Sequence, residues 1–338
     1  MKLSWSGVVL AVGLSLGANA SSAEPFKLIV THLEPPLVPN SVMDLAQELG
    51  YFERAGVDVE FVRVQQTPSA IAALQAGEGD MANISTSAQL SLVARGVDDL
   101  VAVASPNKFL PFLIASRTEF AKVEDLDGAR FGVGRLGSLD HSLSSVVLDA
   151  EGLSLDETEL VALGQPGVRA QALAAGQIDA TTMSIGVWLS LPDRSGLHVL
   201  VEPETYYKTA PLVTKVNVVP RDVLEQRGND VEKVLSVLTQ ASRDFASTPS
   251  IWVDAMVKAR PDVERETLED LAQAYITSWS VNGGLQASEM EYTTNWLFEG
   301  SDFEGATAPA LEDWISFAPM DKVLDALGED ARMDTVSR

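Results

Sequence analysis

The octapeptides ALQAGEGD (residues 73–80) and ALAAGQID (residues 172–179) share the pattern A-L-x-A-G-x-x-D and lie 99 residues apart. Each is typical of a helix that ends at a left-handed glycine and is followed by an acidic turn residue and a strand. Hydroxyl-rich turns follow both copies, at residues 83–87 and 181–184. The repetition predicts two lobes built on one plan. These turns would fall at strand carboxyl ends, where open α/β sheets bind ligands.

The sequence around both copies alternates β-branched runs with segments of helical period, which predicts an α/β protein with mostly parallel sheets covered by helices. Strands are expected at residues 26–31, 57–64, 81–84, 100–104, 112–116, 129–133, 159–163, 179–183 and 197–202. Helices are expected between them at residues 42–54, 69–76, 87–95, 138–150 and 167–175. From Arg221 onward the pattern is helical only.

Composition excludes several functional classes. The chain has 338 residues with a net charge of −24, so it offers no basic face of the size that nucleic acid or an anionic membrane needs. The absence of cysteine excludes disulfides, thiolate metal sites, cysteine nucleophiles and a cysteine-linked lipid anchor. The three histidines form no H-x-x-x-H motif, so neither a metal site nor a cofactor is expected.

The first 23 residues have the pattern of a secretory signal peptide. Lys2 precedes an apolar run at residues 8–16, and small residues at 18–20 and 21–23 offer cleavage sites. Nine apolar residues are too few to span a hydrocarbon core of about 30 Å. We therefore expect export to the periplasm, with a mature chain that begins at Ser21 or Glu24 and is soluble.

Several stretches of the chain resemble one known family. They are GYFERAGVDVE (50–60), the two octapeptides, EDLDGARFGV (124–133) and DAEGL (149–153). In this order and spacing they resemble the periplasmic solute-binding proteins of ABC importers for nitrate, taurine, alkanesulfonates and thiamine precursors. The acidic surface and the segment HLEPP (32–36) depart from that family's pattern, so the ligand is not inherited by analogy.

The resemblance implies a two-lobe clamshell with two mixed sheets flanked by helices and two hinge crossovers. The first lobe would comprise residues 24–110 and 213–338, and the second lobe would be inserted as residues 111–212. The hinge crossings would lie near residues 110–116 and 208–218. The solute would bind between the lobes as they close.

This geometry nominates ligand-binding residues in both lobes. Gly137 and Ser138 precede a long helix and could clamp an anion with its first N–H groups, or Ser138 could simply cap that helix. Ser85 and Thr86 carry the same alternatives in the first lobe. His32 could bond the solute from the first strand end, or lie in an ordinary surface turn.

Aromatic side chains and one methionine are further candidates for contact with the ligand. Trp188 and Phe109 could form the wall for an apolar part of the ligand, or pack in the core, as could Tyr206 and Tyr207. Met183, in the second-lobe turn, is open to either role. Two further histidines are expected to be solvent-side or structural, namely His141 and His198.

The expected function is non-enzymatic: a monomeric periplasmic receptor captures a small solute and delivers it to an ABC permease and its ATPase. The solute is expected to be an organic anion such as a sulfonate or carboxylate. An enzyme on the same fold, a thiamine-precursor (pyrimidine) binder and a receptor that feeds a sensor remain alternatives.

Overall fold

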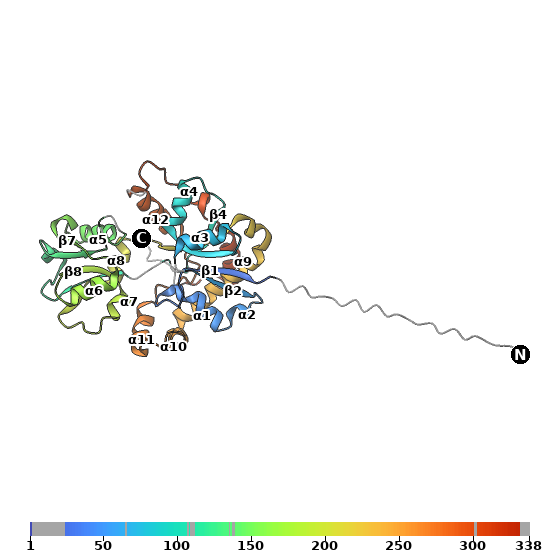
Figure 1. Cartoon of the computed structure of the whole chain (residues 1–338), viewed down its shortest axis with the longest axis horizontal. Helices are drawn as coiled ribbons and strands as arrows, with labels where there is room; N and C mark the ends of the chain where they lie inside the picture. The colour runs from blue at the N-terminus through green and yellow to red at the C-terminus, as the bar shows by residue number, and fades with distance from the viewer. Residues whose placement is uncertain are drawn as a thin grey trace.

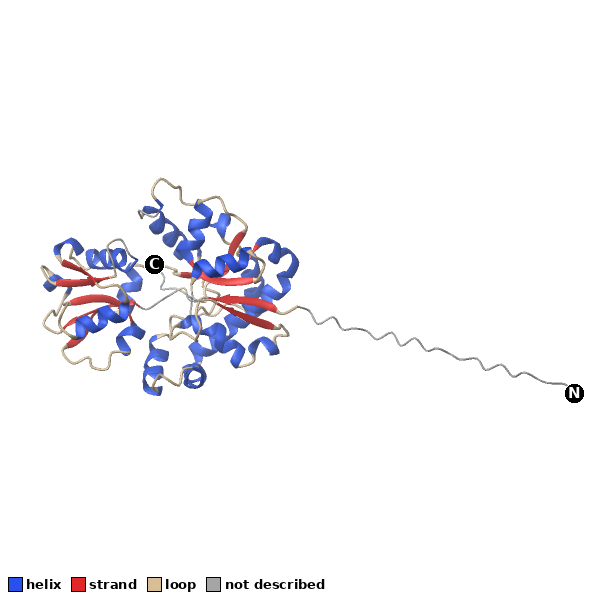
Figure 2. Ribbon diagram, in the orientation of Figure 1, coloured by secondary structure: helices blue, strands red, loops and turns tan. Residues whose placement is uncertain are grey.

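The computed structural model describes residues 1, 24–64, 66–106, 108, 112–134, 136, 139–300 and 303–331. The expected signal peptide therefore lies, apart from Met1, outside the described residues. Strands and helices form two bodies joined side by side (Figure 1). Each body contains one group of strands with helices packed outside it (Figure 2).

Two mixed five-stranded sheets organise the chain, as predicted. The first has the order β2-β1-β3-β10-β4 and the second the order β7-β6-β8-β5-β9. The strands are β1 (Phe26–Val30), β2 (Val59–Arg63), β3 (Met81–Ser85), β4 (Leu100–Ala104), β5 (Phe112–Arg117), β6 (Arg130–Val133), β7 (Glu159–Ala162), β8 (Ala180–Ser184), β9 (Leu197–Val201) and β10 (Lys215–Pro220). In each sheet the fourth strand, β10 or β5, runs antiparallel to both of its neighbours. We call the two bodies the first lobe and the second lobe, after their sheets.

Helices cover both sheets. Those between the strands are α1 (Val42–Glu48), α2 (Tyr51–Arg54), α3 (Thr67–Gln75), α4 (Thr86–Ala94), α5 (Leu139–Ala150), α6 (Pro166–Ala174), α7 (Ile185–Leu189) and α8 (Pro203–Thr209). After β10 come α9 (Arg221–Ser247), α10 (Pro249–Ala259), α11 (Arg265–Ala274), α12 (Ala287–Glu299), α13 (Leu311–Trp314) and α14 (Ala318–Leu327). Short 3-10 turns occupy Pro39–Ser41, Val123–Leu126 and Leu155–Glu157. The long helix α9 packs on α1, α10 and α14 and so fastens the C-terminal helices to the first lobe.

The two octapeptides occupy equivalent places, which explains their repetition. Gly77 has φ +74° and Gly176 has φ +68°, the left-handed conformation that ends α3 and α6. Asp80 then accepts a hydrogen bond from the backbone N–H of Lys27 at the start of β1 (2.7 Å). Asp179 accepts the corresponding bond from Arg130 N–H at the start of β6 (2.9 Å). Each aspartate thus ties the helix end to the neighbouring parallel strand.

Two local expectations were wrong. The predicted helix at residues 42–54 is two helices, because Gly50 takes φ +71° between α1 and α2. The stretches 112–116 and 215–218, expected as parts of the two hinges, belong to β5 and β10 instead. Strand β10 lies between β3 and β4 and is paired with both. Its valines are buried on both faces of the sheet, with Val216 and Val218 in one cluster of core residues and Val219 in another.

Candidate ligand-binding site

Both chain crossings between the lobes join the edges at which the parallel strands of the two sheets end. β4 is antiparallel to β10, as β3 is, so β3 and β4 end at the same edge of the first sheet. The chain leaves that edge after Ala104 and enters β5 at Phe112, beside the carboxyl end of β8. It returns through residues 210–214 to Lys215, beside Ser85 at the end of β3. Both crossings therefore join the carboxyl edges of the parallel strands, where α/β sheets bind ligands.

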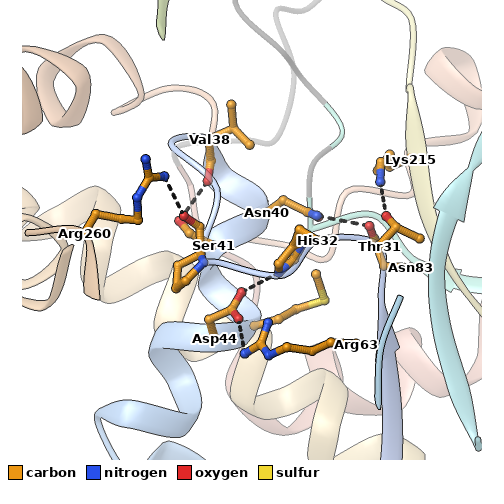
Figure 3. A network of polar contacts seen from close by, with 12 residues as sticks. Thr31, His32, Val38, Asn40, Ser41, Asp44, Arg63, Asn83, Lys215 and Arg260 are labelled. Atoms are coloured by element: carbon orange, nitrogen blue, oxygen red, sulfur yellow. Dashed lines mark hydrogen bonds and ion pairs between the residues drawn. The ribbon is translucent and has the colours of Figure 1, made fainter. Parts of the chain in front are cut away.

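Lys215 lies at this junction, at the start of β10. Its ammonium group donates a hydrogen bond to the hydroxyl of Thr31, which follows β1 (Figure 3). Among the described residues no carboxylate lies within 4.0 Å of it. Burial lowers the pKa of Lys215 below its usual range. An ammonium group with N–H donors to spare is suited to an anionic oxygen.

His32 lies next to Lys215's partner Thr31 and is held in a fixed orientation. Its Nε2 is 2.7 Å from a carboxylate oxygen of Asp44 in the first turn of α1. Asp44 is 2% exposed, and Arg63 donates to its other oxygen at 2.7 Å (Figure 3). With Nε2 fixed by the carboxylate, the ring presents Nδ1 as its remaining polar atom. His32 is therefore a positioned group at the strand edge rather than a surface histidine, and its contact with solute stays a prediction.

Several polar atoms at the same edge of the first sheet are buried without a hydrogen-bond partner among the described residues. They are Oδ1 of Asn40 and the hydroxyls of Thr86 and Thr214. The Asn40 amide donates to Asn83 (3.1 Å), and Asn83 donates to Asn217 (2.8 Å), so the amide chain runs along the sheet from this edge. Ser85 is the N-cap of α4 and accepts from Ala88 N–H at 3.3 Å. Unsatisfied buried polar atoms are costly, so this edge would gain from a polar ligand.

The second lobe contributes a cavity with internally balanced charges. A cavity of about 310 Å³ lies at the ends of β7 and β8, beside the first turns of α5 and α6. Arg169 in its wall is 3% exposed and donates to the Thr181 hydroxyl (3.1 Å) and the Thr182 carbonyl (3.1 Å). Its guanidinium is 3.4 Å from the Asp140 carboxylate. Burial lowers the pKa of Arg169, and the charge of Asp140 opposes that effect.

The amino end of α5 already carries a carboxylate. Asp140 in its first turn accepts a hydrogen bond from Gly134 N–H at 2.7 Å and pairs with Arg169. A first-turn carboxylate interacts favourably with the helix dipole. An anionic solute at this helix end would meet a like charge, which was not apparent from the sequence. The two residues expected to form the clamp there, Gly137 and Ser138, lie outside the described residues, as does Phe109.

The remaining candidates fall in different surroundings. Met183, 1% exposed, lines the second-lobe cavity and also packs in the core behind it. Trp188 on α7 packs partly buried against that core, with the guanidinium of Arg194 5.5 Å from its ring centre. Tyr206 and Tyr207 are buried. His198 bonds the Ser116 hydroxyl at 2.9 Å inside the second sheet, and His141 lies in the first two turns of α5. The ligand-binding roles of Met183 and Trp188 stay predictions.

The lobes also touch on both sides of this junction. On one side α7 packs against α11, and Ile185 joins the partly buried rim of the first-lobe core (Figure 1). On the other side Tyr207 of α8 donates to Glu289 of α12 at 2.6 Å, and the Thr293 hydroxyl accepts from Val213 N–H at 3.0 Å. The second chain crossing is thus braced by buried hydrogen bonds.

Two charged residues of the candidate site, Lys215 and Arg169, were not predicted from the sequence. Lys215 is not part of a recognisable sequence motif. Only the pairing of β10 with β3 brings it beside Thr31 and Ser85. Arg169 could have been noticed as the cation of the second helix–turn–strand unit, three residues before the octapeptide pattern, whereas the first unit has Ala70 at that place. Within the described residues no group of three or more His, Asp or Glu side chains is arranged to hold a metal ion. Nor does any helix described here have the length and apolarity that a membrane span requires.

Comparison with known proteins agrees with this architecture. A binding protein of Brucella abortus is 27% identical over 225 residues, which is 64% of this chain and 67% of that protein. The periplasmic aliphatic sulphonate binding protein SsuA from Escherichia coli superposes with a TM-score of 0.66 at 16% identity, over 87% of this chain and 92% of that one. The desulfurization enzyme DSZB superposes with a TM-score of 0.63 at 17% identity, over 89% of this chain and 99% of that one.

These structural likenesses establish the periplasmic-binding-protein fold, in agreement with the prediction. The family model described as NMT1/THI5 like matches residues 42–250, which is more than half of the chain and includes every strand except β1. The chain belongs to the NMT1/THI5-like family.

Proposed function

We propose that this protein is the solute-binding component of an ABC-type importer, that it works in the periplasm after removal of residues 1–23, and that its solute is a small organic anion. The observation that carries the proposal is Lys215, a partly buried ammonium group at the junction of the lobes whose one described partner is the neutral hydroxyl of Thr31. A buried charge needs a counter-charge, and a bound anion would supply it.

The surroundings of Lys215 favour an oxyanion. The hydroxyls of Thr86 and Thr214 are buried without partners in the described part of the chain and could donate to carboxylate or sulfonate oxygens. This local arrangement supports anion capture by a protein whose net charge is −24. The Brucella abortus relative is named a binding protein, and SsuA is named for sulphonate binding, which agrees with this class of solute.

The clamshell would work by closing on the solute. We propose domain boundaries at residues 24–110 plus 213–338 for the first lobe and 111–212 for the second. The two chain crossings between the lobes, one of which is residues 210–214, would absorb the backbone change. A permease and its ATPase would then receive the closed, loaded form, and the binding protein would act as a monomer.

Enzymatic action on the same fold is the second candidate, since DSZB is named an enzyme. The positioned His32–Asp44 pair is the observation in its favour, because such a pair fixes the tautomer of a general base. The Ser116–His198 pair does not serve this purpose, since Ser116 is fully buried within β5. A binding protein needs no turnover, so incubating the purified protein with the bound solute and recovering the solute unchanged distinguishes the two candidates.

A thermal-shift screen tests the proposal. The purified protein is heated with sulfonates, aromatic carboxylates, nitrate and pyrimidines, each at several concentrations. A solute at 100 times its Kd should add about 2.7 kcal/mol to the unfolding free energy. We expect the stabilising compounds to be organic anions. Stabilisation by a neutral pyrimidine and by none of the anions would contradict the proposal.

A further inference from the structure

The second-lobe cavity can accommodate a part of the solute that the first-lobe edge cannot. Its wall includes the carbon surfaces of Phe112, Leu143 and Met183, and its volume is about 310 Å³. A cavity of about 150 Å³ lined by apolar side chains holds benzene. The second-lobe cavity therefore has room for one aromatic ring or a short alkyl group.

Charged groups in the wall of this cavity satisfy each other. Arg169 is paired with Asp140 and donates to the carbonyls of Gly164 and Thr182. Asp140 also accepts from Gly134 N–H. With its guanidinium committed to protein groups and its charge balanced, Arg169 has little attraction left for an anion. Desolvating a charged solute group there would cost free energy without a counter-charge to repay it.

The opposite edge has the complementary character. Lys215 lies there with a spare charge, beside the buried hydroxyl of Thr86 and the amide oxygen of Asn40, neither of which has a partner among the described residues. Both chain crossings join these two edges, and α7, which follows β8 in the second lobe, packs against α11 of the first lobe. A solute that spans the two edges would meet a polar, cationic surface at one end and a charge-balanced, largely apolar cavity at the other.

Resting on the anion-binding function proposed above, we propose that the solute is bipartite. Its anionic group binds at Lys215 in the first lobe. An uncharged apolar group fills the second-lobe cavity, and this group is a single ring or a short alkyl chain. Met183 is the specificity-determining residue of that cavity. It ends β8, is 1% exposed and lies between the cavity and the second-lobe core, and its flexible thioether adapts to the shape of the group it contacts.

Three probes of graded chemistry test the proposal by isothermal titration calorimetry on the purified protein. Methanesulfonate has the anionic group alone, benzenesulfonate has the anionic group and a ring, and benzyl alcohol has a ring without charge. We expect benzenesulfonate to bind at least tenfold more tightly than methanesulfonate, and benzyl alcohol to bind more weakly than benzenesulfonate. Equal affinities for the two sulfonates would overturn the bipartite proposal.

Two variants locate the ring. Met183→Gln places an amide in the cavity wall and should reduce the preference for benzenesulfonate over methanesulfonate to less than threefold. Met256→Gln is the matched control, because Met256 is equally buried in α10 of the first-lobe core, away from the cavity, and should leave the preference unchanged. A preference that survives in Met183→Gln would contradict the assignment of the cavity. If that variant does not fold, the parent's probe preference still decides whether the solute is bipartite.

Failure of this proposal and failure of the anion-binding function give different results. If Lys215→Met weakens both sulfonates and the ring adds nothing, the bipartite proposal is wrong and anion binding stands. If benzyl alcohol binds as tightly as benzenesulfonate and Lys215→Met changes neither affinity, the anion-binding function is wrong. Absence of binding for all three probes contradicts both.

Discussion

Replacing Asp179 by Asn should destabilise the second lobe, because this carboxylate closes the second octapeptide onto β6. It accepts hydrogen bonds from Arg130 N–H (2.9 Å), Nε (3.0 Å) and Nη2 (2.7 Å). Asparagine keeps one acceptor oxygen, but it loses the charge and turns an amide N–H₂ towards the guanidinium. Hydrogen bonds to charged groups contribute about 1.5–3 kcal/mol, whereas solvent-exposed ion pairs contribute about 0–1 kcal/mol.

The exposure of the two side chains decides between these magnitudes. The Arg130 side chain is 36% exposed and that of Asp179 is 10% exposed. The solvent-exposed ion pair therefore contributes little to the stabilisation by Asp179, and the hydrogen bonds to the partly buried carboxylate contribute most of it. The expected loss is about 2 kcal/mol of unfolding free energy at pH 7.

The loss should depend on pH in a defined direction. Hydrogen bonds from Arg130 hold the pKa of the Asp179 carboxyl below its usual range. Since the folded-state pKa is lower than that of the unfolded chain, the carboxylate stabilises the protein above about pH 4, and this contribution is lost as pH falls through the folded-state pKa. The difference between parent and variant should be constant from pH 7 to pH 5 and should shrink below about pH 4.

Urea denaturation followed by circular dichroism measures this difference. Asp80→Asn is the matched variant in the first lobe, where Asp80 holds Lys27 N–H and the Arg227 guanidinium. Asp325→Asn, at an exposed position on α14, is the control for removing one negative charge and should leave the midpoint unchanged. An Asp179→Asn midpoint equal to that of the parent at pH 7, or a difference in unfolding free energy that is as large at pH 3 as at pH 7, would refute the reasoning.

Three further outcomes are expected. Gly77→Val and Gly176→Val should each lower the unfolding free energy by about 1 kcal/mol or more, because φ is +74° and +68° there, and unaltered denaturation midpoints would contradict this. Tyr207→Phe should lower the thermal midpoint by removing the 2.6 Å bond to Glu289, a loss of about 1–3 kcal/mol, whereas an unchanged midpoint would mean that α12 does not brace the crossing. Burial lowers the pKa of Lys215, so the ammonium group should lose its proton, and anion affinity should fall, below the usual lysine pKa of about 10.4. An affinity that stays constant in calorimetry from pH 7 to pH 10 would contradict the role of Lys215.

Much of the fold could be predicted from periodicity. Apolar runs bounded by turn residues located nine of the ten strands within about two residues, and the octapeptides located the repeated helix end. The repeated helix end could be located because it depends on local residues. A glycine with positive φ ends the helix, and an aspartate a few residues later binds the neighbouring strand. The break at Gly50 was missed because the apolar pattern continues across it from α1 to α2.

The internal strand β10 could not be assigned from local sequence. Residues 215–220 are short, end in proline and lie between a helix and a long helix, which is equally typical of an extended linker. Only the pairing with β3 and β4, more than 100 residues earlier in the chain, makes this segment a strand.

The candidate site was predictable in position but not in charge. Ser85, Thr86, His32 and Met183 lie at strand carboxyl ends, as the hydroxyl-rich turns indicated. The charged groups depend on pairing across long sequence separations: Lys215 meets Thr31 across 184 residues, and Arg169 meets Asp140 across a folded helix–strand–helix unit. The sequence therefore indicated the strand edges at which we propose that a solute binds, whereas the proposal that the first lobe holds the charge of the solute rests on the structure.

The central claim is that the spare charge of Lys215 holds an anionic solute. Its most direct test is calorimetric titration of the strongest anion from the thermal-shift screen into the parent, Lys215→Met and Lys233→Met. Lys233 is the charge-matched control, since it lies on α9 and bonds the Gly56 carbonyl at 3.1 Å, at the far edge of the first sheet. A hydrogen bond to a charged group contributes about 1.5–3 kcal/mol, and each 1.4 kcal/mol is tenfold in Kd. We expect Lys215→Met to weaken binding by about tenfold to a hundredfold and Lys233→Met to leave it within about twofold, whereas equal affinities for the parent and Lys215→Met would contradict the claim.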